Sequence, residues 1–160
     1  LESGIKDYGI IYKDNNVQVN AFTVNHGRLQ SLAYKFITED KTIVVSGDTC
    51  PVEIMKEKAR DADILLHECE YTKGLETRSE QWQIYHRNVH TLSVDLAKLA
   101  IVAKPKLLVT YHRIYHMNVF DRSFDLKQEM EIRKQAILEE IKDAGYNGKV
   151  INGEDLDIFE

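Results

Sequence analysis

The sequence predicts an α+β fold, in which a mixed β-sheet is flanked by helices, and two observations lead to that prediction. Short apolar stretches separated by polar turns fill residues 9–46, a pattern typical of an antiparallel meander. From residue 51 onward, apolar stretches of strand length alternate with segments of helical periodicity, which indicates strand–helix units. A chain of 160 residues is long enough for a real core, and we expect a single domain over residues 1–160.

The first part of the chain is expected to form four strands, at residues 9–12, 17–24, 31–38 and 42–46. A polar turn at residues 14–16 separates the first two strands. In the second strand the alternation predicts two faces, with Val17, Val19 and Ala21 on one and Gln18, Asn20 and Phe22 on the other.

The second part is expected to alternate helices and strands. Helices are predicted at residues 51–62, 91–103 and 123–144, and strands at 63–66, 106–110, 150–151 and 156–159. Pro51 suits the first turn of its helix, Thr91 or Ser93 can cap the second, and Gly145 ends the third. Residues 69–89 are long and polar, so we expect a functional or mobile loop there.

Composition narrows the function classes only slightly. The formal net charge of −5 argues against a dedicated nucleic-acid binder. Cys50 and Cys69 form neither a C-x-x-C pair nor a disulfide framework, so we expect reduced thiols and a cytoplasmic location. No apolar run reaches membrane-spanning length, and no membrane partner is expected.

Polar side chains recur in one structural position, just past an expected strand. They are His26, Asp48, His67-Glu68 and His112. Strands that pair in one sheet bring their ends together, so we expect these side chains to lie close to one another. Imidazole and carboxylate groups are the ligands that zinc and similar divalent ions bind, and a carboxylate between two histidines suits a two-metal centre.

Each of these residues also has a plainer interpretation. Asp48 alone would be a helix cap, and Glu68 alone a solvated carboxylate. A lone histidine after a strand is usually a loop or core residue, and His67 is expected to be structural. His116 is a rival for His112 a few residues away, and His86 and His90 alone could belong to a polar surface loop.

Three stretches in order resemble the metallo-β-lactamase superfamily, in the hydrolase branch that includes ribonuclease Z and the arylsulfatase-like enzymes. They are TIVVSGDTCP, DADILLHE and VHTLSVDLAKLAIVAKPKLLVTYH, and the resemblance covers residues 17–112. The signature H-x-H-x-D-H motif of that superfamily is absent from this chain. The resemblance therefore implies the second half of an αββα sandwich, without the N-terminal half that carries the motif. The missing half, or a second copy in a homo-oligomer, would cover the inner face of the sheet.

The resemblance also implies a role for each site residue. His26, Asp48 and His112 would bind two divalent metal ions, with zinc favoured and manganese or iron as alternatives. Asp48 would bridge the two ions. Glu68 and His90 would form a catalytic proton relay that serves the leaving group. His86 is the runner-up for His90, but only His90 is followed by a threonine at a helix start.

The function implied is that of a metal-dependent hydrolase, in which a metal-activated water attacks a phosphodiester or ester. The substrate would be a small-molecule ester or phosphodiester, or RNA, although no strongly basic stretch supports RNA. This chain alone is expected to be incomplete and inactive. The alternatives are an arylsulfatase-like or small-ester hydrolase, and a non-catalytic fragment or interaction module without a complete metal site.

Overall fold

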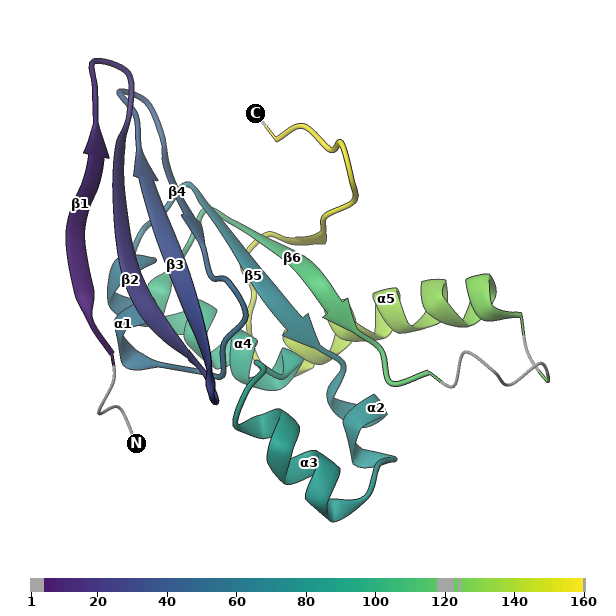
Figure 1. Ribbon diagram of the computed structural model, residues 1–160. Coiled ribbons are helices and arrows are strands. Elements are labelled where there is room, and N and C mark those ends of the chain that lie inside the picture. The colour runs from purple at the N-terminus through teal and green to yellow at the C-terminus, as the bar shows by residue number, and fades with distance from the viewer. Residues whose placement is uncertain (1–4, 118–122, 124, 160) are drawn as a thin grey trace.

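The computed structural model describes residues 5–117, 123 and 125–159, which form one seven-stranded sheet with helices (Figure 1). The strands lie in the sheet in their sequence order and are β1 (Asp7–Lys13), β2 (Gln18–His26), β3 (Leu29–Ile37), β4 (Thr42–Val45), β5 (Ile64–Glu70), β6 (Leu107–Ile114) and β7 (Val150–Asn152). The helices are α1 (Glu53–Lys58), α2 (Thr72–Glu76), α3 (Glu80–Arg87), α4 (Ser93–Ala103) and α5 (Leu126–Asp143).

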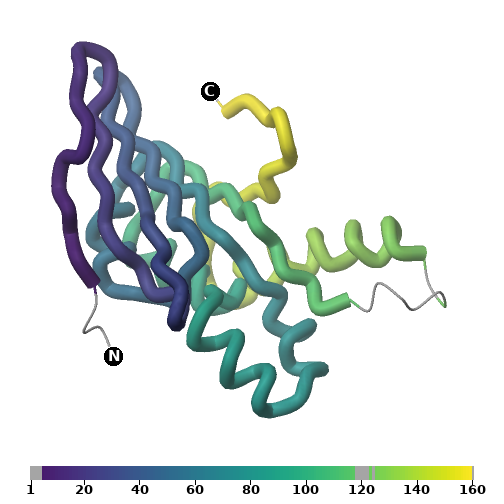
Figure 2. Tube along the Cα trace, viewed as in Figure 1, coloured from purple at the N-terminus to yellow at the C-terminus, as the bar shows by residue number. Residues whose placement is uncertain are grey.

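The sheet is mixed, as the sequence predicts. Strands β1 to β4 pair antiparallel, and β4 to β7 pair parallel. Figure 2 follows the chain from the meander into the strand–helix units. The first hairpin closes at Asp14, whose Oδ1 accepts the backbone N–H groups of Asn16 and Val17, each at 2.8 Å. The α+β prediction is therefore confirmed.

Helices α1, α4 and α5 cover one face of the sheet (Figure 1). Alternate strand residues point toward them, because successive side chains in a strand lie on opposite faces. The core joins the two layers and includes Phe22, Val44, Leu65 and Leu108 from strands and Met55, Leu96, Leu99, Ile137 and Ile141 from helices. Among the described helices, none has the length and apolar character needed to cross a membrane.

The opposite face of the sheet is apolar but only partly buried. It carries the residues that alternate with those of the core, among them Tyr34, Phe36, Val45, Leu66 and Ile151. Each of these keeps part of its surface in contact with solvent. A sheet that is apolar on both faces is typical of a fold with a second layer, so this open face is suited to being covered.

In strand β2 the face that packs against the helices is the one with the more polar residues at its start. Phe22 shares that face with Gln18 and Asn20, as the alternation predicts, and it is fully buried in the core beneath the helices. Ala21 on the other face is also buried, because this small side chain lies opposite Tyr34 on the neighbouring strand.

Strand β5 is longer than predicted. It continues through His67 to Glu70, and the expected loop at residues 69–89 contains the end of β5 followed by α2 and α3. Pairing with β6 continues along these polar residues and holds them in the sheet, whereas the pairing with β4 ends at Leu66. Cys50 and Cys69 are buried free thiols, as expected.

Several element ends also shift. Helix α1 begins after Val52, so Pro51 lies outside its first turn. Neither Thr91 nor Ser93 caps α4, whose N-cap residue is Leu92 without a capping side chain. Helix α5 begins at residue 126 rather than 123. Residues 156–159 form no strand. Gly145 follows α5 with a φ of 97°, in agreement with the prediction that it ends this helix.

Candidate metal centre

Asp48 lies between two histidines at the carboxyl end of β4. Its Oδ2 is 4.0 Å from Nε2 of His26, and its Oδ1 is 3.4 Å from Nδ1 of His112. Each carboxylate oxygen thus faces a different imidazole. Asp48 does not cap α1, because the N-cap residue of that helix is Val52, so the plainer interpretation of Asp48 is wrong.

The turn before Asp48 requires glycine. Gly47 has a φ of 61°, and a Cβ at this position would lie 2.4 Å from the carbonyl oxygen of Leu32 on β3. Only a residue without a side chain allows this approach of the two backbones. Gly47 therefore places Asp48 at the rim of the sheet, where its side chain is 36% exposed.

His26 ends β2 with one ring nitrogen already committed. Its Nδ1 lies 2.8 Å from the carbonyl oxygen of Val89. Because a carbonyl oxygen only accepts, Nδ1 carries the proton, and Nε2 presents its lone pair toward Asp48. Metal-binding histidines commonly donate the N–H of the second ring nitrogen to a backbone carbonyl, so the hydrogen bond of His26 is typical of a metal ligand.

His112 reaches the site through a β-bulge in β6. Tyr111 pairs with Glu68 and Arg113 pairs with Cys69, so His112 is the extra residue between them. Its φ of 42° lies in the left-handed region, which a non-glycine residue adopts only where the surroundings enforce it. The half-exposed side chain is thereby turned toward Asp48.

Glu68 and His90 form an ion pair next to these residues. The fully buried Glu68 carboxylate accepts the N–H of Thr49 at 2.7 Å and contacts Nδ1 of His90 at 3.0 Å. Burial raises the pKa of Glu68, and the hydrogen bond from His90 opposes that rise. Burial lowers the pKa of His90, but the hydrogen bond and charge of Glu68 outweigh burial, and the net pKa is raised.

The ring of His90 contacts both candidate histidine ligands. Its centroid lies 5.0 Å from that of His26 and 5.8 Å from that of His112. One ligand atom each of Glu68, His90 and His112 lies within 4.8 Å of the others, so these side chains can also gather around one ion. The donor atoms at this rim are those that zinc and related ions bind.

The rival histidines lie elsewhere. His86, which the sequence placed in a polar loop, is a buried residue of α3, and it contacts Glu70 together with His116. Sequence reasoning missed Glu70, because β5 was expected to end before it. The available signal was spacing, since each pair of histidines, 86 with 90 and 112 with 116, is separated by four positions.

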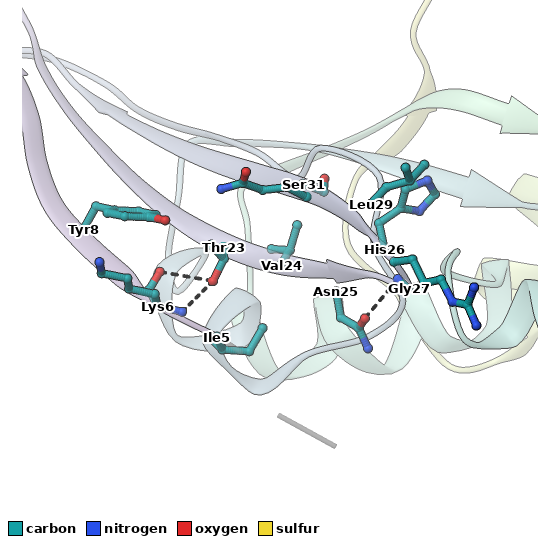
Figure 3. A pocket seen from close by; sticks show the side chains of 12 residues that line it. Ile5, Lys6, Tyr8, Thr23, Val24, Asn25, His26, Gly27, Leu29 and Ser31 are labelled. Carbon is teal, nitrogen blue, oxygen red and sulfur yellow. Dashed lines mark hydrogen bonds between the residues drawn. The ribbon is translucent and has the colours of Figure 1, made fainter. Parts of the chain in front are cut away.

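A cavity of about 480 Å³ lies beside the first three strands and includes His26 in its lining (Figure 3). The figure shows Lys6 and Tyr8 at one end and His26 with Leu29 at the other. Arg28 adds a second cation to the lining. The cavity therefore places His26 beside a partly basic surface suited to an anionic group.

No protein-family model matches the chain. Over 79 residues it is 35% identical to a ribonuclease Z of Ignicoccus hospitalis, an alignment covering 49% of this chain and 24% of that relative. Over 59 residues it is 36% identical to a zinc phosphodiesterase ELAC protein 2 homolog of Caenorhabditis elegans, covering 37% of this chain and 7% of that relative. The resemblance to metallo-β-lactamase superfamily hydrolases is confirmed by these relatives.

Solved structures extend the likeness to almost the whole chain. The metallo-β-lactamase fold protein YhfI of Bacillus subtilis matches with a TM-score of 0.67 at 15% identity, over 93% of this chain and 52% of its own. The fold is that of the metallo-β-lactamases. Human tRNase Z, short form, matches with a TM-score of 0.60 at 18% identity, over 94% of this chain and 44% of its own. The chain thus spans about half of each solved neighbour, and the aligned part spans about a quarter of the ribonuclease Z.

Proposed function

We propose that this chain is one half, the second, of a metal-dependent phosphodiesterase of the metallo-β-lactamase fold. The observation that supports this most directly is the position of Asp48, whose two oxygens face His26 and His112 separately. His26 with Asp48 would hold one divalent ion, and Asp48 with His112 would hold the other, with zinc favoured at both. When bound, the two ions would polarise the scissile group and lower the pKa of the attacking water.

His90 is proposed as the general acid for the leaving group. Glu68 fixes the ring by accepting the proton of Nδ1, which leaves Nε2 as the nitrogen that exchanges a proton with substrate. The raised pKa of His90 keeps the imidazolium populated closer to neutral pH. A leaving oxygen that takes a proton from Nε2 would depart as an alcohol or hydroxyl group.

The remaining ligands are proposed to come from a first half that carries the H-x-H-x-D-H motif. That half would also cover the open sheet face around Tyr34, Phe36 and Leu66. A phosphodiester is the proposed substrate class, and the names of the relatives favour RNA among phosphodiesters. The proposed location is the cytoplasm, where the two thiols would stay reduced.

Metal content tests the ligand assignment. Elemental analysis of the purified chain should find bound zinc, manganese or iron, and the bound amount should fall in Asp48→Ala. Asp155→Ala is the matched control, because this aspartate lies on the surface far along the chain from the rim, and it should retain the wild-type amount. Bound metal that is equal in all three proteins would contradict the assignment of Asp48, whereas metal absent from all three would mean that the site needs the ligands of the first half.

Activity tests the reaction. The chain joined to a first half with the motif should cleave bis(p-nitrophenyl) phosphate, and His90→Ala should lower kcat by about 10²–10⁴. Parallel assays with p-nitrophenyl sulfate and an RNA precursor separate the substrate classes. Preference for the sulfate would favour the arylsulfatase-like alternative. Inactivity toward all three substrates would favour a non-catalytic interaction module.

A further inference from the structure

A second cluster of metal-binding side chains lies next to the candidate centre. Glu70 comes from the end of β5, His86 from α3, and His116 from the segment that follows β6. Nδ1 of His86 is 2.7 Å from Oε1 of Glu70, and Nε2 of His116 contacts the same oxygen. One ligand atom of each residue lies within 4.8 Å of the others. These three residues are the Glu70 triad.

The Glu70 triad is buried and its polar atoms are incompletely satisfied. Glu70 is fully buried, and the side chains of His86 and His116 are 9% and 4% exposed. Oε2 of Glu70 has no hydrogen-bond partner among the described residues. Nδ1 of His86 also has no hydrogen bond among the described residues, although it lies 2.7 Å from Oε1 of Glu70. Such groups are costly inside a protein unless a proton or a cation joins them.

The Glu70 triad repeats the composition of its neighbour. The neighbouring group of Glu68, His90 and His112 is the Glu68 cluster. It also takes one glutamate from β5, one histidine from residues 86–90 and one from residues 112–116. The two glutamates are two positions apart on one strand, so they lie on the same face of the sheet. The rings of His86 and His90 are 5.5 Å apart, and the two clusters are adjacent.

Solvent reaches the Glu70 triad through a cleft. A hollow of about 610 Å³ is lined by both histidines of the triad and by Arg78, Trp82 and Met117. The Trp82 ring packs 4.7 Å from that of His86 and forms one wall. A small ion can therefore enter, and a water molecule in the cleft can reach an ion held by the three side chains.

From this geometry we propose that the Glu70 triad is a separate, mononuclear site for a zinc-type divalent cation. Two imidazoles and one carboxylate are a known zinc ligand set that leaves the fourth position open. Nδ1 of His86, Nε2 of His116 and a Glu70 oxygen would be the ligands. The ion replaces the proton between these groups, satisfies the buried carboxylate, and ties α3 and the segment after β6 to β5.

Zinc binding with the first centre removed tests this proposal independently of the proposed function. The starting protein is the double variant Asp48→Ala/His112→Ala. It removes ligands from the proposed Asp48 centre and from the group of Glu68, His90 and His112, the two places at the rim where an ion could bind. This double variant should bind one equivalent of Zn²⁺ in equilibrium titrations. Adding His86→Gln should weaken that binding by more than about 100-fold, because it removes a ligand. Adding Tyr85→Phe, on the exposed side of α3, is the matched control and should leave it unchanged.

NMR of the histidine rings in the double variant, where the Glu70 triad is intact, tests the site without relying on the His86 variant, which could lose binding by misfolding. Titration of the double variant with Zn²⁺ should shift the ring nitrogens of His86 at Nδ1 and of His116 at Nε2. His67, which is buried outside the cluster, should not shift. The proposal is overturned if the double variant binds no Zn²⁺, or if bound Zn²⁺ leaves the signals of His86 and His116 unchanged.

Discussion

Nδ1 of His90 lies 3.0 Å and 3.1 Å from the two oxygens of the Glu68 carboxylate, so a single ring N–H is shared across both. The carboxylate is fully buried and also accepts the N–H of Thr49. If the carboxylate turned away, the buried N–H groups of Thr49 and His90 would lose their acceptor. This pair fixes both the orientation and the tautomer of His90.

Replacing Glu68 by glutamine should therefore lower the pKa of His90. The amide keeps the size of the side chain and an acceptor for Thr49, but it removes the negative charge that stabilises the imidazolium. Loss of an opposite charge at this distance corresponds to a fall of about one unit or more. NMR titration of the His90 ring measures the change. The variant Glu139→Gln, at an exposed position of α5, should leave the His90 titration in place. An unshifted His90 in Glu68→Gln would show that the charge of Glu68 does not raise its pKa.

Alanine at Gly47 should destabilise the chain more than alanine at Gly9. Both glycines have positive φ, of 61° and 65°, so both variants carry the strain of the left-handed region, about 1–2 kcal/mol. Only the new Cβ at residue 47 meets backbone, at 2.4 Å from the Leu32 oxygen, whereas nothing lies within 4 Å at residue 9. We expect the free energy of unfolding to differ by about 2 kcal/mol between the variants. Urea unfolding compares them, and equal losses would mean that the loop moves away from Leu32.

Alanine at Glu140 should loosen the docking of α5. This buried carboxylate accepts the N–H groups of Thr72 and Lys73, each at 3.0 Å, and the hydroxyl of Ser93. Truncation leaves buried donors at the start of α2 unpaired, so we expect a loss of about 2–4 kcal/mol in the free energy of unfolding. Denaturant unfolding measures it beside Glu139→Ala, the exposed neighbour, which should change it by less than about 0.5 kcal/mol. Similar losses at both positions would contradict this role for Glu140.

The stability of the chain should fall between neutral pH and about pH 4 because of His67. Burial lowers the pKa of this histidine to about 4, from an ordinary value of 6.5. Between these values the unfolded chain takes up a proton that the folded chain does not, so stability is lost as the pH falls and is fully present above pH 6.5. The expected loss by pH 4.5 is about 2–3 kcal/mol.

His67→Asn separates this contribution from that of other groups. The asparagine amide can replace the Nδ1–H that His67 donates to the Glu68 carbonyl, at 2.8 Å, but it does not titrate in this range. Urea unfolding at pH 7 and 4.5 should therefore show a smaller loss in the variant than in the wild type. A loss of the same size in both proteins would mean that His67 is protonated in the folded chain.

The order and type of the main elements were predictable because the patterns behind them are local. Three β-branched residues in a row mark β4, and the helical spacing of Leu92, Leu96 and Leu99 marks α4. The candidate site residues His26, Asp48, Glu68 and His112 were found because each follows an apolar stretch of strand length. These signals lie within short stretches of chain, so they can be recognised without knowledge of the contacts with distant segments.

The missed features depend on contacts between distant segments. Phe22 is buried because helices far along the chain pack on it, which an alternating pattern does not record. Glu70 continues β5 because β6 pairs beside it. The bulge that turns His112 toward Asp48 is a mismatch of register between two strands, and no single residue encodes it.

The open sheet face and the proposed metal centre belong to the same sheet, and the proposed function assigns further ligands to a polypeptide that covers this face. A polypeptide that docks on Tyr34 and Phe36 comes to lie near the rim that holds Asp48. If it also brings metal ligands, docking of the polypeptide raises the affinity for metal, and bound metal raises the affinity for the polypeptide by the same factor. Such a chain would then respond to its complementary half as a switch, with metal affinity set by the concentration of the docking partner.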